Sequence, residues 1–382
     1  MIIGVDASNI RGGGGVTHLV ELLKAADPKS KGIEKVCLWA GGNTLSAVEN
    51  RPWLSKISHE YLDRSLFHRI YWQKFLLSEL ARKEGCDILF VPGGTFSGKF
   101  RPFVSMSQNL LPFEPKEMGR YGISKTSFRL LLLYFTQSSA FRRADGNIFL
   151  TDFARSRVLR KVPLLLEKTK VVNHGINPKF FSKPSVQRNI SDFDGSKPFE
   201  ILYVSFVGEY KHQWNVVEAV RILKEKGFPV RLTLIGSPDE PKAVSKLRKS
   251  IEKADPEKKY ILYLDKVTYS EIQRYYQKTN LFAFASSCET FGQIVTEAMA
   301  SGCPIACSEM SAMPEILGDA GLYFNPLDPI SIERVLERMI LSEELRRDLA
   351  KIAFERAGTF SWKKAADETF DFLVKIRREF TA

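Results

Sequence analysis

The feature that most constrains the fold of this chain is an apolar run followed by a glycine-containing turn and a helical pattern. Residues 281–285 (Leu-Phe-Ala-Phe-Ala) predict a buried strand. Small residues and Gly292 then lead into an apolar repeat of helical period, which Gly302 and Pro304 terminate. A helix that starts directly after a buried strand is typical of a parallel α/β sheet.

The same alternation of strands and helices occupies both halves of the 382-residue chain. A polar, proline-containing stretch interrupts it between residues 178 and 197, and the alternation then restarts. We therefore expect two doubly wound parallel domains, 1–178 and 198–362, joined by a linker over 179–197. The expected strands are 2–7, 36–40, 88–91, 103–107, 146–150, 171–173, 200–205, 231–235, 260–264, 281–285, 305–306 and 322–324, and the expected helices include 16–25, 66–83, 214–226, 242–254, 270–277 and 330–342.

The positive charge of the chain lies in its first half. Residues 1–180 hold 27 Lys and Arg against 15 Asp and Glu, whereas residues 181–382 hold 29 of each, so the first half carries the whole net charge of +12. This excess indicates an acidic surface or substrate facing the first half. Nucleic acid would also fit the charge, but no stacking-aromatic motif, helix-turn-helix pattern or zinc spacing accompanies it, so we expect no nucleic acid.

The sequence predicts a cytoplasmic protein. Its longest apolar run, 130–135, is far shorter than the roughly 18–20 residues that span a bilayer. The first residues, 1–6, lack a basic region and a cleavage site, and we expect a strand there rather than a signal peptide. Five scattered cysteines, an odd number, predict reduced and buried thiols.

Two carboxylates flank the turn after the strand at 281–285. Glu289 lies just before the expected helix and Glu297 about two turns inside it. The N-terminus of a helix offers unpaired amides and the positive end of a dipole, which together favour phosphate. This arrangement suits a nucleotide sugar, with its phosphates on the amides, its sugar hydroxyls on Glu289 and its ribose hydroxyls on Glu297.

Residues 289–304, Glu-x-Phe-Gly-x-x-x-x-Glu-Ala-x-Ala-x-Gly-x-Pro, resemble the Glu-x7-Glu signature of the retaining GT-B glycosyltransferases of family four. The resemblance implies two Rossmann-like doubly wound domains facing across a cleft, with the last helix, here 363–382, crossing back onto the first domain. It also implies transfer of a hexose, with retention, from a nucleoside-diphosphate sugar, without cofactor or metal. By analogy, the acceptor is a saccharide or lipid-linked saccharide in bacterial surface polysaccharide synthesis.

The resemblance extends to further segments and implies roles for them. Gly14, Gly15 and Val16 match the family's glycine loop, and Lys211 takes the place of its phosphate-binding lysine. Gln108 stands where many relatives carry a histidine near the reacting centre. We therefore expect Glu289, Lys211 and Gln108 to be catalytic, and the donor to bind Gly14, Gly15, Lys211, Lys266, Val267, Glu289, Phe291, Gly292, Gln293, Ile294 and Glu297.

The chain also departs from the family pattern. The arginine usually found some five residues before the lysine is replaced here by Phe206, so Arg11 or the amides would have to supply that charge. Gln108 cannot titrate near neutral pH, so we assign no general base. In such enzymes the leaving phosphate is thought to take the acceptor proton, which requires no base. Asp192 and Asp194 resemble the Asp-x-Asp metal motif of another fold but lie in the polar linker, and we expect no metal.

Several alternatives remain open at this point. The glycine loop could be a dinucleotide-binding turn, although no acid ends the second strand. The GT-B fold also occurs in phosphorylases and nucleotide-sugar epimerases. A basic lipid- or nucleic-acid-binding protein with a vestigial site is a third possibility. The basic, aromatic stretch 120–143 is either a core helix with a solvated rim or a surface that lies on anionic lipid, and the charge of the first half favours peripheral membrane association.

Overall fold

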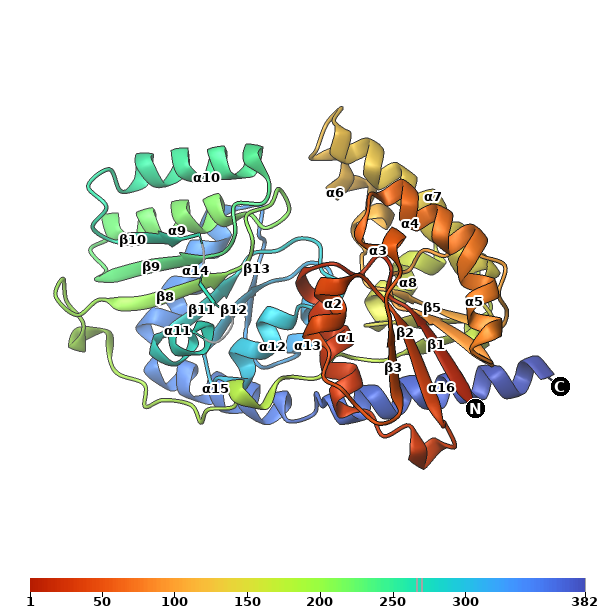
Figure 1. The fold of residues 1–382 in the computed structure, drawn as a ribbon. Coiled ribbons are helices and arrows are strands. Elements are labelled where there is room, and N and C mark those ends of the chain that lie inside the picture. The colour runs from red at the N-terminus through yellow and green to blue at the C-terminus, as the bar shows by residue number, and fades with distance from the viewer. Residues whose placement is uncertain (266, 269–270, 382) are drawn as a thin grey trace. The chain divides into compact units, whose positions relative to one another are not determined.

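The computed structural model describes residues 1–265, 267–268 and 271–381 (Figure 1). The chain forms two compact units. The first contains Met1–Met118, Gly122–Gly175 and the chain from Ser361 onward, and the second contains Gly119–Tyr121 and Ile176–Phe360. The segment 179–197, expected to be a linker, clusters with the second unit and carries two short turns of 3-10 helix, Pro178–Phe180 and Ile190–Asp192.

The first unit is built on a seven-stranded parallel sheet in the order β3-β2-β1-β4-β5-β6-β7. Chain order reverses between β1 and β4, the central pair of a doubly wound sheet. Most strand residues are buried because helices cover both faces of such a sheet. The strands are β1 (Ile2–Asp6), β2 (Lys35–Trp39), β3 (Leu54–Ile57), β4 (Ile88–Val91), β5 (Phe103–Ser107), β6 (Gly146–Phe149) and β7 (Thr169–Val171).

Helices that lie far apart in the chain complete the first unit. The last helix, α16 (Trp362–Thr381), packs on α1 (Gly13–Ala25) and on β4 and β6. Gly146 provides room for it, since a Cβ there would lie 2.9 Å from Ile376 and Phe372. The other helices are α2 (Gly42–Ala47), α3 (Glu60–Asp63), α4 (Leu66–Tyr71), α5 (Leu77–Lys83), α6 (Pro115–Gly119), α7 (Lys125–Arg143) and α8 (Asp152–Leu159).

The second unit is built on a six-stranded parallel sheet in the order β10-β9-β8-β11-β12-β13. Here chain order reverses between β8 and β11. The strands are β8 (Phe199–Val204), β9 (Val230–Ile235), β10 (Ile261–Leu264), β11 (Leu281–Phe284), β12 (Ile305–Ser308) and β13 (Leu322–Phe324). The helices are α9 (Gln213–Glu225), α10 (Pro241–Ala254), α11 (Ile272–Lys278), α12 (Gln293–Ala300), α13 (Met313–Leu317), α14 (Pro329–Leu341) and α15 (Glu343–Ala357).

The two doubly wound parallel sheets confirm the predicted fold class. Some expected boundaries were wrong. The helix expected over 66–83 is interrupted by a π-helical turn, Trp72–Leu76, between α4 and α5. The strand expected at 171–173 forms two residues earlier, as β7, and β3 was not anticipated. The start of the helix expected over 270–277 lies outside the described residues. All five cysteines are buried, and none of them forms a disulfide.

Candidate functional site

The carboxyl ends of β8 and β11 define the centre of the candidate site in the second unit. These strands are neighbours in the sheet, and chain order reverses between them. In open parallel sheets the loops that leave such a strand pair diverge and leave a crevice in which ligands bind. The loop after β8 carries Lys211 and the loop after β11 carries Glu289. The topology therefore explains why two residues 78 positions apart in sequence come together.

Lys211 and Glu289 form a buried ion pair, in which Lys211 Nζ donates to Glu289 Oε1. The Lys211 side chain is 4% exposed and that of Glu289 is 16% exposed. Three aromatic rings surround the ammonium group, with centroids at 5.0 Å (Phe206), 4.8 Å (Tyr210) and 5.5 Å (Phe284). Rings at this distance attract a cation through their electron-rich faces. Phe206, which stands where the resembled family carries an arginine, thus forms one side of the aromatic enclosure around Lys211.

Ser311 holds the backbone of the turn at Glu289. Its hydroxyl accepts a hydrogen bond from the Glu289 N–H at 2.7 Å and donates to the Glu289 carbonyl at 2.8 Å. Ser311 adopts a left-handed backbone conformation, with φ of 62°. On the other side of the turn, the Ser287 amide donates to the Tyr210 carbonyl at 2.9 Å and ties the two loops together. These contacts fix the direction in which Glu289 leaves the turn.

The helix α12 begins immediately after Gly292, which has φ of 90°. A Cβ at this position would collide with the Met313 methyl group, so both the conformation and the available space require glycine. The first amides of a helix have no carbonyl partner within that helix and point out along its axis. Phe291, Gln293 and Ile294, predicted to hold the donor phosphates, lie at this helix start; Phe291 is buried, and the other two are partly exposed.

Glu297 lies in the second turn of α12 and is 6% exposed. The Tyr276 hydroxyl donates to Glu297 Oε2 at 3.4 Å. Tyr276 itself is packed edge-on against Phe180 and tilted against Phe282. The Tyr276 hydroxyl therefore positions the Glu297 carboxylate, which is predicted to bind ribose.

His212 lies beside the ion pair in sequence and supports the start of α9. It adopts a left-handed conformation with φ of 51° and is 2% exposed. Its Nε2 is 2.9 Å from the Ser287 hydroxyl. Burial, with further contributions from Arg120 and Lys246, lowers the pKa of His212 to about 3. The imidazole is neutral at physiological pH and serves as a structural partner of the Glu289 loop.

In the first unit, the predicted residues gather at the carboxyl ends of β1, β4 and β5. Gly14 and Gly15 belong to the first turn of α1. Gln108 follows β5, and its Nε2 donates to the Pro92 carbonyl at 3.2 Å. A Cβ at Gly15 would lie 3.7 Å from Gln108 Oε1. The glycine loop and Gln108 are therefore neighbours, as a shared site requires.

Two arginines lie beside this glycine loop. Arg69 Nη1 and Arg11 Nη1 both donate to the Arg64 carbonyl, at 2.9 and 3.3 Å, and Arg69 Nε donates to Asn9. Burial and the nearby charge of Arg11 lower the pKa of Arg69. Arg11, considered as a substitute for the missing arginine, thus lies in the first unit next to a second cation.

The remaining predicted donor residues are placed farther away. Val267 follows β10, the edge strand, and β9 and β8 separate that strand from β11. Lys266 lies outside the described residues. Asp192 and Asp194 lie at the second 3-10 turn, where Asp194 accepts hydrogen bonds from the Ser196 and Lys197 amides. Within the described ranges there is no group of three or more His, Cys, Asp or Glu residues that could hold a metal ion.

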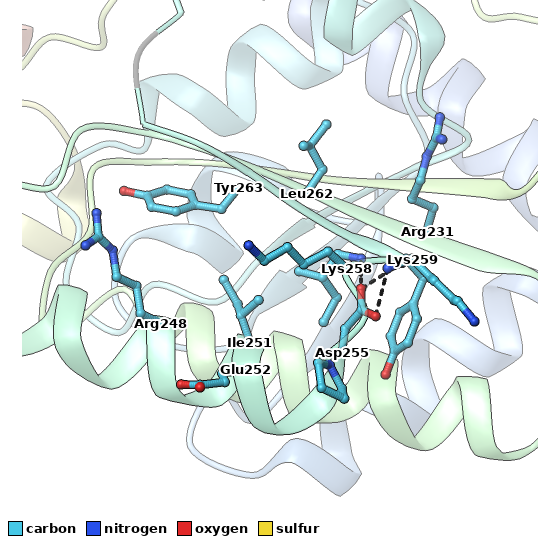
Figure 2. Close-up of a pocket in the computed structure, with 12 residues that line it drawn as sticks. Arg231, Arg248, Ile251, Glu252, Asp255, Lys258, Lys259, Leu262 and Tyr263 are labelled. Carbon is cyan, nitrogen blue, oxygen red and sulfur yellow. Dashed lines mark hydrogen bonds between the residues drawn. The ribbon is translucent and has the colours of Figure 1, made fainter.

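A concavity of about 670 Å³ lies along α10 and the edge of the second sheet (Figure 2). It is lined by Arg231, Arg248, Lys258 and Tyr263 among others. Asp255 in this groove accepts hydrogen bonds from three consecutive backbone amides, at 2.8, 2.7 and 2.7 Å, which gives it a structural role at the start of β10. The groove follows the edge strand, whereas Lys211 and Glu289 follow the central strands.

Sequence reasoning did not find Ser311 or the aromatic enclosure of Lys211. Ser311 lies 22 residues after Glu289, in the loop that follows β12, and no motif connects the two. Phe206 was noted only as the replacement of an arginine. Phe284 belongs to an apolar strand whose residues all predict core positions. Such contacts depend on how neighbouring loops turn, and the sequence carries no periodic signal for this.

Part of the chain is similar to a known protein family. Residues 187–356 match the model of the family "Glycosyl transferases group 1". The serotype-specific mannosyltransferase WbdA of Escherichia coli is 24% identical over 289 residues, which is 73% of this chain and 34% of that protein. A D-inositol 3-phosphate glycosyltransferase of Corynebacterium glutamicum is 27% identical over 176 residues, or 44% of this chain and 42% of that protein. The chain thus spans about a third of the length of the curated relatives that it matches first.

Solved structures agree with the fold. Sucrose-phosphate synthase from Thermosynechococcus elongatus superimposes with a TM-score of 0.77 at 17% identity, covering 100% of this chain and 98% of that chain. HepE from Anabaena, in complex with UDP and glucose, gives 0.69 at 18% identity, covering 98% and 99%. Among the residues that the structure describes, no helix has the length and apolar character needed to cross a bilayer. The chain has the GT-B fold, and its residues 187–356 match the model of the glycosyl transferases group 1 family.

Proposed function

We propose that this protein is a retaining glycosyltransferase that moves a hexose from a nucleoside-diphosphate sugar to a saccharide or lipid-linked saccharide acceptor. The observation that carries the proposal is the buried Lys211–Glu289 pair in the loops after the two central strands of the second unit, with Glu289 directly before the start of α12. The pair places a fixed cation and a fixed carboxylate where a helix dipole already favours phosphate. The family match to residues 187–356 supports the same chemistry.

The donor would bind to the second unit. Its diphosphate would lie at the N-terminus of α12, and Lys211 would neutralise the charge that develops on the leaving phosphate. Because Glu289 already forms an ion pair with the Lys211 ammonium group, the diphosphate must compete with the Glu289 carboxylate or bind Lys211 beside it. Glu289 would accept hydrogen bonds from the sugar hydroxyls, and Glu297, held by Tyr276, from the ribose hydroxyls.

Sugar transfer would occur on one face of the anomeric carbon. The acceptor oxygen bonds to that carbon as its bond to the phosphate oxygen breaks, and the acceptor proton passes to the departing phosphate. Gln108 would orient a hydroxyl through its amide without exchanging a proton. The charge on the leaving group would be stabilised by Lys211 and the α12 amides, so the reaction would require neither a divalent metal nor a cofactor.

The biological role is proposed from the relatives. The WbdA proteins are named serotype-specific mannosyltransferases, and another relative, 30% identical over 112 residues, is an O-antigen chain mannosyltransferase of Escherichia coli. These names support a role in bacterial surface polysaccharide synthesis and mannose as the first sugar to test. HepE binds UDP, so a UDP-sugar is the next donor to test. A lipid-linked acceptor would bring the protein to the inner face of the cytoplasmic membrane.

The proposal is tested by measuring nucleotide-dependent stabilisation and turnover in the same samples. UDP, GDP and ADP and their sugars are screened by thermal shift, and the true donor nucleotide should add about 2.7 kcal/mol of stability at a hundredfold its dissociation constant. Glu289→Gln should lower turnover by about 10² or more. EDTA should leave turnover unchanged. If none of the nucleotides stabilises the protein, or if only EDTA-sensitive turnover is found, the proposed mechanism is wrong.

A matched variant controls for loss of folding. Lys83 and Glu79 form an ion pair on the surface of α5, with side chains 70% and 66% exposed. Glu79→Gln removes a charge of the same kind, and it should leave both turnover and nucleotide stabilisation unchanged. Inorganic phosphate as an alternative acceptor separates a phosphorylase from a transferase, because only a phosphorylase would release sugar phosphate.

A further inference from the structure

The exposed large apolar side chains of this protein concentrate in two segments of the first unit. One segment covers α4 and the π-helical turn, where Phe67 is 82% exposed and Phe75 is 56% exposed. The other covers α7, where Phe128 is 64% exposed and Phe135 is 58% exposed. The full set is Leu66, Phe67, Ile70, Tyr71 and Phe75 in the first segment and Phe128, Leu131, Leu132 and Phe135 in the second. We call these nine residues the apolar face.

The spacing within each segment shows that these side chains form stripes. In α7 the residues 128, 131, 132 and 135 recur at intervals of three and four, which places them on one side of a helix. The residues 67, 70, 71 and 75 follow the same rule. Such a stripe usually marks the buried side of a helix. Here the buried side is a different one, formed in α7 by Leu130, Gln137 and Phe141 among others.

The two stripes belong to one layer of helices. Trp72 from the first segment, Leu77 at the start of the adjoining helix α5 and Ala140 from α7 pack into the same core cluster. Both segments also hold the loop after β4: Gln73 accepts from the Ser97 amide at 2.9 Å, and Arg143 donates to the Gly98 carbonyl at 3.1 Å. In Figure 1, α4, α5 and α7 accordingly lie together within the first unit. The stripes therefore occupy the outer side of a single layer.

Cations without carboxylate partners accompany the apolar face. The helix α7 contains Lys125, Arg129, Arg142 and Arg143 and no acidic residue. Lys74, which lies over the Phe75 ring at 5.3 Å, adds a cation to the first segment. Within the described part of the chain, Lys74, Lys125, Arg129 and Arg142 form no ion pair. In contrast, Glu79, the acid of residues 66–83, is paired with Lys83.

We propose that the apolar face, with these cations around it, docks onto the surface of a bilayer that contains anionic phospholipids. Phenylalanine and leucine side chains would enter the boundary between headgroups and acyl chains, as they do in interfacial helices. The unpaired Lys and Arg side chains would contact lipid phosphates. An acidic protein surface would match the charge, but it would leave four phenylalanines spread over two helices without a defined pocket. The docking surface goes beyond the proposed sugar transfer and does not depend on it.

The test uses the full chain and sedimentation with vesicles, which requires no catalysis. Vesicles of phosphatidylcholine alone are compared with vesicles in which one third of the lipid is phosphatidylglycerol. The wild-type protein should sediment with the anionic vesicles, and added salt should weaken the binding because it screens the lipid charge. Leu131→Ser/Leu132→Ser should weaken the binding by about tenfold or more. Leu165→Ser/Leu166→Ser, a pair that is 58% and 60% exposed elsewhere in the first unit, should bind like the wild type.

A second variant separates docking from misfolding. Phe67→Ser/Phe75→Ser changes the other stripe and should weaken vesicle binding by a similar factor, while circular dichroism and the thermal midpoint stay those of the wild type. The proposal is overturned if the wild type ignores anionic vesicles, if neutral vesicles bind it equally well, or if the Leu165/Leu166 control loses as much binding as the stripe variants. Nucleotide stabilisation, measured in parallel, reports on the donor site alone.

Discussion

A double-mutant cycle on Lys211 and Glu289 tests whether the ion pair is the electrostatic centre of the second unit. Lys211→Met keeps an apolar stem against the three rings but removes the ammonium group, so Glu289 is left without its partner. Removing one partner of a buried pair costs about 3–5 kcal/mol. Glu289 retains 16% exposure and some hydration, so we expect the lower end, about 3 kcal/mol.

The other two corners of the cycle give the coupling energy. Glu289→Gln leaves a cation that is 4% exposed among aromatic rings, and it should cost a similar amount. The double variant leaves neither charge unpaired and should recover part of the loss. We therefore expect an interaction energy of about 2 kcal/mol, within the range of about 0.5–3 kcal/mol found for residues in contact. The exposed Lys83–Glu79 pair should give no more than about 0.5 kcal/mol in the same cycle.

Urea denaturation, followed by circular dichroism, measures the free energy of unfolding of each variant. Turnover and nucleotide-dependent thermal shifts are recorded on the same preparations, well below the transition temperature. Both single variants should lose donor stabilisation. An interaction energy equal to that of the Lys83–Glu79 control would refute the reasoning, because the pair would then contribute no more than two solvated charges. Full donor stabilisation in Lys211→Met would likewise exclude Lys211 from phosphate binding.

Three further predictions concern Gly292, Ser311 and two buried histidines. Gly292→Ala should destabilise the protein by more than about 1 kcal/mol and abolish donor stabilisation, since the Cβ meets Met313 and φ is positive; a thermal shift like that of the wild type would contradict this. Ser311→Ala should lower turnover more than stability, because it releases the backbone at Glu289, and kcat measured beside the urea midpoint checks this. His18 is a buried residue of α1. Burial lowers the pKa of His18 well below its ordinary value and that of His212 to about 3, so unfolding takes up protons in acid. The contribution of the two neutral histidines to the free energy of unfolding should be fully present above about pH 6.5. Below that pH it should fall by up to about 1.4 kcal/mol per pH unit for each histidine. A His18→Leu variant should therefore lose less stability than the wild type between about pH 7.5 and 5.5.

The fold was predictable from the sequence because buried parallel strands are continuous apolar runs. Leu281–Phe284 and Ile88–Val91 are buried at every position and could be recognised directly. The edge strand β3, Leu54–Ile57, has four half-buried residues and mixes polar with apolar side chains, so it gave no such signal. The π-helical turn at Trp72–Leu76 could not be predicted from the sequence either, because a widened turn changes the hydrogen bonding of a helix without changing its composition.

The candidate site was predictable to the level of its motifs but not of its contacts. The glutamate spacing located the start of α12 and both carboxylates, since one local segment carries them all. The pairing of Lys211 with Glu289 depends on β8 and β11 being neighbours, which only the sheet order shows. The partners of Glu289 and Glu297, namely Ser311 and Tyr276, come from other loops and helices. Their positions are set by tertiary packing and leave no pattern in the sequence.

The packing of α16 has a consequence for how the protein is made. The first unit takes its last helix from beyond residue 360, so the ribosome must synthesise the entire second unit before the first can be completed. Until then the surfaces of β4, β6 and α1 that α16 covers stay open to water, including the space beside Gly146 that Phe372 and Ile376 fill. The first unit is therefore the one that needs protection from aggregation during translation, although its other residues are the first to leave the ribosome.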